Sequence, residues 1–126
     1  MEELDVGQVI IAKQIENSAN YLKFKEIVNL KHINVVIVEK GKRIVIEDEL
    51  YLDVLWPDEN NLIEENGLNN NSIVCKLQFK DFSMLFTGDI EESAEKLMLS
   101  ENINIKADVL KVAHHRFKNI KYRKIC

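Results

Sequence analysis

The sequence predicts an α+β fold, a mixed β-sheet with helices on one face. Two observations predict it. The apolar patterns follow one another as strand, helix, several closely spaced strands, helix and strand, and closely spaced strands with short turns favour antiparallel pairing. The chain contains no glycine-rich phosphate loop, which argues against a doubly wound parallel sheet. With 126 residues, the chain fits one domain or part of one.

The first half of the chain combines β-branched runs with one helical pattern. Residues 9–12 are apolar and predict a buried strand. Asn17 or Ser18 offers an N-cap for a helix over residues 19–30, where apolar residues recur at helical spacing. Strands are expected over residues 33–38, 43–46 and 50–55. Trp56-Pro57 ends the last of these strands, because proline cannot donate to a ladder.

The second half begins with a polar segment over residues 58–71, which is interpreted as a loop. Residues 72–79 and 82–87 predict two strands joined by a tight turn at Lys80-Asp81. A helix is expected over residues 89–100, with glutamates in its first half, where the helix dipole favours them. Asp89 fits the N-cap position of that helix. Residues 107–113 predict the last strand.

Composition and charge limit the classes of function. The net charge is −4, and no apolar run approaches the roughly 20 residues that span a bilayer, so no transmembrane segment is expected. An acidic chain does not fit a general nucleic-acid binder. Five basic residues nevertheless lie within 116–126, a tail interpreted as solvated or accidental. Cys75 and Cys126 have no metal-type spacing, and Cys75 is interpreted as a core residue.

A carboxylate and two imidazoles follow two of the predicted strands. Thr87-Gly88-Asp89 ends one strand, and His114-His115 ends the last strand. Carboxylate and imidazole are ligands that hydrolytic zinc or manganese sites use, with one position left for water. A catalytic zinc takes about three protein ligands, and the remaining histidine, His32, is interpreted as a surface or capping residue. Asp89, His114 and His115 therefore suggest part of a metal site.

The amino-acid sequences of several stretches strengthen the interpretation of a metal site. They are Asn-Asn-Asn-Ser-Ile-Val at 69–74, Phe-Ser-Met-Leu-Phe-Thr-Gly-Asp-Ile-Glu at 82–91 and Ala-Asp-Val-Leu-Lys-Val-Ala-His-His at 107–115, preceded by Lys-Gly at 40–41 and Leu-Trp-Pro at 55–57. Together they closely resemble the metallo-β-lactamase-fold hydrolases. The subgroup is the one found as the C-terminal domain of ComEC-like competence proteins, which take up DNA, and as stand-alone relatives.

The resemblance implies an αββα sandwich with a metal cluster at the sheet edges. It implies metal-assisted hydrolysis, often of phosphodiesters, with Zn²⁺ or Mn²⁺ as cofactor. Asp89 matches the family's metal-bridging aspartate, and one of His114 and His115 matches its last metal-binding histidine. Nucleic acid or another phosphodiester is the substrate class that the resemblance implies.

The family's first metal motif, His-x-His-x-Asp-His, does not occur in this sequence, which holds three histidines in total. Residues 1–115 are therefore expected to form a partial domain, the second half of the sandwich. The family usually continues His-His-Gly-Ser, whereas residues 116–126 form a basic tail that departs from it. The residues after His115 can be written back into DNA with suitable synonymous codons. When the first base of that DNA is removed, the shifted frame encodes Gly-Ser-Lys-Thr-Ser-Ser-Thr, which is the continuation expected of the family. This suggests that the tail is translated out of frame.

Three hypotheses follow from the sequence. The chain is a truncated metal-dependent hydrolase, a catalytically inactive fragment of a degraded gene, or a half-domain that binds a partner supplying the missing motif. An incomplete sandwich would expose apolar sheet faces, which favours association. The chain as encoded is expected to be cytoplasmic or soluble, whereas full-length competence relatives are membrane proteins.

Overall fold

The computed structural model describes residues 5–13 and 18–113 and contains two separate β-sheets. The first is a parallel pair of β1 (Gln8–Ala12) and β2 (Asn34–Val38), joined through α1 (Ala19–Leu30). Parallel neighbours need such a crossover, and a helix usually provides it. Ser18 caps α1, since its Oγ accepts a hydrogen bond from the Tyr21 amide at 3.2 Å. One of the two N-caps expected from the sequence is thereby confirmed.

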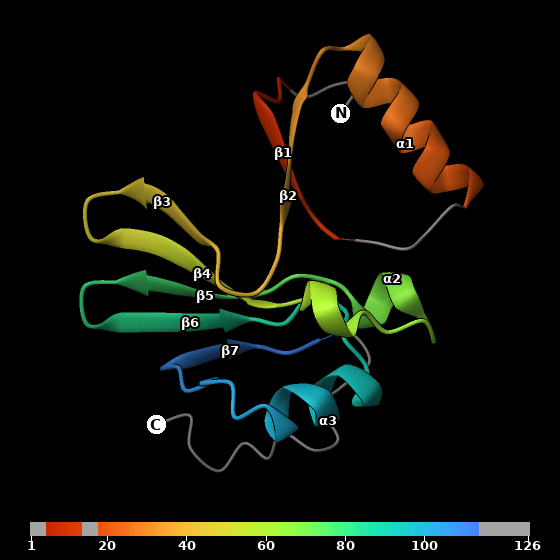
Figure 1. Ribbon diagram of the computed structural model, residues 1–126. Coiled ribbons are helices and arrows are strands. Elements are labelled where there is room, and N and C mark those ends of the chain that lie inside the picture. Colours follow the sequence, from red (N-terminus) through yellow and green to blue (C-terminus); the bar gives the residue numbers. More distant parts are fainter. Residues whose placement is uncertain (1–4, 14–17, 114–126) are drawn as a thin grey trace.

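The second sheet has five strands in the order β3-β4-β5-β6-β7 (Figure 1). Its strands are β3 (Arg43–Glu47), β4 (Leu50–Trp56), β5 (Val74–Phe79), β6 (Phe82–Phe86) and β7 (Val109–Lys111). The first three pairings, which end with the β5–β6 hairpin, are antiparallel, whereas β6 and β7 are parallel. Lys80 and Asp81 form the hairpin turn, as predicted, with Lys80 at a φ of +52°. The α+β class is confirmed.

Short helices connect the strands of this sheet. A 3₁₀ turn η1 (Glu59–Asn61) and the one-turn helix α2 (Gly67–Asn70) lie in the segment expected to be a loop. The helix α3 (Glu92–Ser100) leads towards β7. All three α-helices lie toward one end of the strands (Figure 1), and within the described residues no helix is long and apolar enough to cross a membrane.

The core lies between α3 and one face of the five-stranded sheet. Leu85 of β6 packs there with Ala94 and Met98 of α3, all at most 2% exposed. Trp56, at 0% exposure, belongs to the same cluster and donates its indole N–H to the Asn70 carbonyl at 2.7 Å. Burying an aromatic ring with its N–H satisfied is the favourable arrangement for tryptophan.

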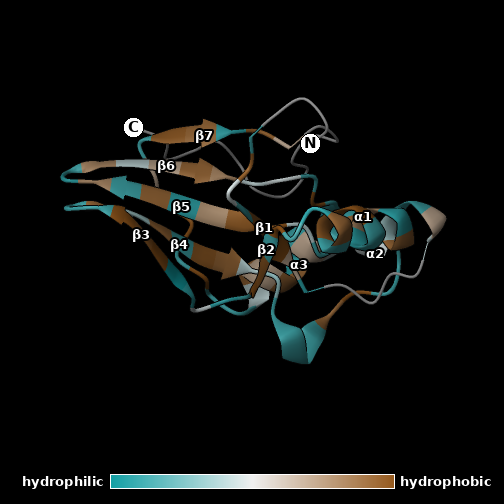
Figure 2. Ribbon diagram, turned by 90° about the horizontal axis from the view of Figure 1, so that it is seen from above, coloured by the Kyte–Doolittle hydropathy of each residue, from teal (hydrophilic) through white to brown (hydrophobic). Residues whose placement is uncertain are grey.

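The opposite face of this sheet is mostly apolar, although Lys111 of β7 lies opposite Phe86 on it. The residue pairs put Ile44, Leu52, Leu77, Met84 and Val109 in one row across all five strands. Leu50, Phe79 and Phe82 form a second row, and Cys75 and Phe86 belong to a third. Figure 2 shows the alternation of apolar and polar residues along most of β5.

Two expectations from the sequence need correction. A single mixed sheet was expected, but β1 and β2 pair only with each other, because their apolar patterns define strands without defining partners. Cys75 was expected in the core, but it is half-buried on the apolar face away from α3, where surrounding side chains still raise the pKa of its thiol by desolvation.

Candidate functional site at the carboxyl ends of β6 and β7

Asp89 lies beyond the carboxyl end of β6, in an exposed turn that starts at Thr87. The neighbouring strand β7 runs parallel to β6, with Phe86 opposite Lys111. The buried Thr87 hydroxyl donates to the Lys111 carbonyl at 2.9 Å and ties the two strand ends together. The chain therefore leaves β7 towards residue 114 at the same sheet edge from which Asp89 projects.

His114 and His115 lie outside the described residues, which end at the buried Ala113. Their place beside Asp89 remains a prediction from the parallel strands. His32 is exposed at the carboxyl end of α1 and has a φ of +52°, a conformation common in residues that end helices. That position agrees with its interpretation as a capping residue.

Gly88 lets the turn approach the β5 segment closely. Its φ is +52°, and a Cβ built on it would lie 2.8 Å from both the Ile73 carbonyl oxygen and the Ser72 Oγ. A non-glycine residue would meet both left-handed strain and a backbone clash. The position of Asp89 therefore requires glycine at residue 88, which explains the glycine in the Thr-Gly-Asp motif.

An asparagine-rich cradle over residues 66–72 holds the turn. Ser72 Oγ accepts a hydrogen bond from the Asp89 amide at 2.9 Å and donates to the Asn69 carbonyl at 2.7 Å. The buried Asn70 accepts from the Glu91 amide at 3.0 Å and donates to the Glu65 carbonyl at 2.8 Å. These side chains satisfy amides that no helix or strand would satisfy, so the backbone around Asp89 is fixed.

Asp89 is not the N-cap of α3, as one interpretation of the sequence had it. The helix begins at Glu92 with Glu91 as N-cap, and the Glu91 carboxylate accepts from Asn66 and Asn69 at 2.9 and 3.2 Å. The cradle already holds the backbone amides of residues 89 and 91, so the helix starts later. Asp89, exposed and outside the helix, keeps its carboxylate available to solvent.

The described residues alone do not fit a metal ion. No group of three or more histidine, cysteine, aspartate or glutamate side chains is placed to hold one within residues 5–13 and 18–113. Asp89 offers one carboxylate where a catalytic zinc takes about three protein ligands. No catalytic step can be built from this part of the chain.

A cavity of about 430 Å³ opens beside the turn. Its walls come from β1, α1, α2 and the start of β5, and Gly88 lines it next to Asp89. The lining residues are Ile11, Ala12, Tyr21, Phe24, Leu68, Ser72, Ile73 and Gly88. The cavity is therefore mostly apolar, and the sequence analysis did not anticipate it because β1 and the Gly88 turn are far apart in the chain.

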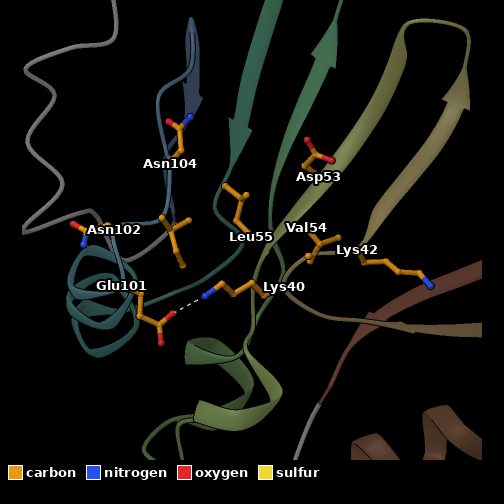
Figure 3. A pocket seen from close by; sticks show the side chains of 10 residues that line it. Lys40, Lys42, Asp53, Val54, Leu55, Glu101, Asn102 and Asn104 are labelled. Atoms are coloured by element: carbon orange, nitrogen blue, oxygen red, sulfur yellow. Dashed lines mark hydrogen bonds and ion pairs between the residues drawn. The ribbon is translucent and has the colours of Figure 1, made fainter.

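A second cavity, of about 440 Å³, lies between the β2–β3 turn and the end of α3 (Figure 3). Lys40 bonds Glu101 across it at 3.1 Å and lies 4.0 Å from Asp58. The pKa of Asp58 lies below its usual value, chiefly because its carboxylate accepts a hydrogen bond from the Asn60 amide. A hydrogen bond from the Asn61 side chain and the charge of Lys40 add to the effect. Lys40 is thus paired with both acids, so this cavity is a structural junction.

The chain is similar to ComE operon protein 3 of Bacillus subtilis strain 168, with 30% identity over 113 residues. The match covers 90% of this chain and 14% of that protein, so the chain spans about one seventh of its relative's length. No family model matches the chain, and no solved structure matches it. The resemblance to competence proteins thus has support from sequence comparison, and the metallo-β-lactamase fold stays a prediction.

Proposed function

We propose that this chain is the second half of a metal-dependent hydrolase domain of the competence-related kind, and that it is inactive by itself. The observation that carries the proposal is the shared sheet edge, where β6 delivers Asp89 and β7 leads towards His114 and His115. Asp89 serves as one metal ligand, and the motif His-x-His-x-Asp-His comes from another stretch of polypeptide. Phosphodiesters are the substrate class, by resemblance to the family.

The rigid turn supports a ligand role for Asp89. A metal ligand needs a fixed backbone and an accessible carboxylate, because a mobile ligand loses entropy on binding. The cradle fixes the amides of Asp89 and Glu91, and Gly88 sets the approach to Ser72. An ordinary surface aspartate would not require this arrangement.

Metal analysis of the purified chain tests the proposal. The chain alone should bind zinc and manganese weakly and should not hydrolyse bis-p-nitrophenyl phosphate. Co-expression with a polypeptide that carries His-x-His-x-Asp-His should give a complex with near-stoichiometric metal. Asp89→Asn should remove most of that metal, whereas Asp81→Asn, in the exposed turn at the opposite end of β6, should retain it. Hydrolysis by the chain alone, or equal metal in both variants, would overturn the proposal.

The apolar sheet face favours the half-domain hypothesis over a degraded fragment. Five strands about 4.8 Å apart make a face roughly 20 Å wide, and its central row is apolar on every strand. Phe79, Phe82 and Val109 on this face are 40–43% exposed. Exposed apolar patches of this kind usually mark interaction surfaces. The occupant proposed here is the polypeptide that carries the missing motif.

Neighbouring residues on opposite faces of β5 allow a matched test. Leu77 lies in the central apolar row, and Gln78 points to the other face. Leu77→Lys should abolish co-purification with the partner, while Gln78→Lys should preserve it. Equal co-purification of both variants would refute this face as the interface.

Genomic DNA tests the frameshift hypothesis. If the shifted frame after the His115 codon continues without family-like residues, that hypothesis is refuted.

A further inference from the structure

Two aromatic rings line the cavity beside Asp89. Tyr21 and Phe24 lie one turn apart on α1, with ring centroids 6.3 Å apart and planes inclined by 19°. Both rings are half-buried, so part of each faces the cavity. Ile11, Leu68 and Ile73 supply the other apolar contacts. A cavity of about 430 Å³ with aromatic walls has the size and chemistry to hold a flat heterocyclic ring.

The wall that carries these rings has a net positive charge in an acidic chain. Residues 8–38 contain four lysines and two glutamates, whereas the whole chain has a net charge of −4. Lys25 Nζ lies 4.8 Å from the Tyr21 ring centroid, in cation–π contact with it. Lys13 is exposed directly after the cavity residue Ala12, and Lys23 is exposed on α1. The charge at this wall therefore complements an anionic ligand.

Aromatic platforms beside lysines are the usual means by which proteins hold single-stranded nucleic acids. Bases stack on the rings, and the cations face the phosphates. We propose that this cavity binds one nucleobase of a single-stranded nucleic acid, stacked on Tyr21 and Phe24, with Lys25 facing the adjoining phosphate. The proposal rests on the proposed function, since it assigns the substrate class and its binding mode at the same edge.

The position of the cavity links base binding to the metal-ligand turn. Gly88 is part of the cavity wall, and Asp89 is the next residue. A nucleotide with its base in the cavity would have its phosphodiester near the turn that carries Asp89. The cavity would thus orient the strand, while Asp89 is not needed for stacking.

Fluorescence anisotropy of a fluorescein-labelled oligothymidylate tests the proposal. The full chain is titrated at low ionic strength in EDTA, so that binding does not depend on any metal. An abasic oligonucleotide of equal length keeps the phosphates and lacks the bases, and it should bind at least about fivefold more weakly. Tyr21→Ala and Phe24→Ala should each weaken oligothymidylate binding roughly 5- to 100-fold.

The sheet hairpin offers a matched control. Lys80 Nζ lies 5.4 Å from the Phe79 ring centroid, which copies the Lys25–Tyr21 contact at an exposed site away from the cavity. Lys80→Gln should leave the affinity unchanged, while Lys25→Gln should weaken it and lower the salt slope by about one. Trp56 fluorescence checks the fold of each variant.

The outcomes separate this proposal from the proposed function. Absent oligothymidylate binding, equal binding of the abasic strand, or equal losses in the cavity and hairpin variants would each overturn it. Asp89→Asn should keep full affinity in EDTA. If oligothymidylate binds as expected while the co-expressed complex takes up no metal, the cavity assignment stands and the hydrolase proposal fails.

Discussion

Replacing Gly88 by alanine tests how tightly the Asp89 turn is held. Gly88 has a φ of +52°, and a left-handed conformation costs an alanine about 1–2 kcal/mol. The new Cβ would also lie 2.8 Å from the Ile73 carbonyl oxygen and from Ser72 Oγ. Forcing a methyl group into such a space costs about 1–3 kcal/mol. We therefore expect Gly88→Ala to lower the free energy of unfolding by roughly 2–5 kcal/mol.

Urea denaturation followed by fluorescence measures this loss. The chain has a single tryptophan, Trp56, which is fully buried and bonded to the cradle through the Asn70 carbonyl. Its emission therefore reports on the packing around the turn. The midpoint should fall with little change in the denaturant slope, because the surface exposed on unfolding is nearly the same.

Two other glycines separate strain from steric clash. Gly41 has a φ of +93° with nothing within 4 Å of a built Cβ, and Gly7 has open space without a positive φ. Gly41→Ala should cost about 1–2 kcal/mol, and Gly7→Ala should be neutral or stabilising by up to about 1 kcal/mol. If Gly88→Ala costs no more than Gly41→Ala, the close approach to Ile73 does not hold the turn, and the reasoning fails.

Three further predictions concern the site and its surroundings. Asn70→Ala should cost about 1–3 kcal/mol in urea denaturation, since it removes two part-buried hydrogen bonds to the backbone; a loss below about 0.5 kcal/mol would contradict the cradle. Thr87→Val removes the 2.9 Å bond to Lys111 and should cost about 1 kcal/mol, with faster amide exchange in β7 as the specific sign. Asp58 has a depressed pKa, so its contribution to stability is present above the unfolded pKa and disappears as pH falls through the folded one. In Asp58→Asn, the free energy of unfolding should therefore fall less steeply below about pH 4. An unchanged dependence on pH below about 4 would contradict the hydrogen bond from the Asn60 amide as the cause of the lowered Asp58 pKa.

Local patterns were sufficient for most of the strands and turns. The apolar runs predicted β4, β5 and β6, the Lys80-Asp81 turn was placed correctly, and Ser18 was one of two expected caps. These features depend on neighbours in sequence, which the sequence displays directly. The expected helix start at Asp89 was wrong, because distant asparagines satisfy the amides near it.

The candidate site was half visible in the sequence. Thr87-Gly88-Asp89 was recognised from its sequence, but the roles of Asn70 and Ser72 were not. The run of asparagines before β5 was a signal for hydrogen bonds from side chains to the backbone. The aromatic cavity could not be predicted, since Tyr21 and Gly88 are brought together only by the fold.

The sequence by itself determined most of the strands, the Lys80-Asp81 turn and the α+β class, and it predicted Asp89 as a candidate ligand. Only the tertiary structure decided that β6 and β7 are parallel, that β1 and β2 form a sheet of their own, and that one face of the larger sheet is mostly apolar. The physical reason is that side-chain alternation records which face of a strand is buried, whereas strand partners and the groups that satisfy a turn's amides depend on contacts between residues far apart in the chain.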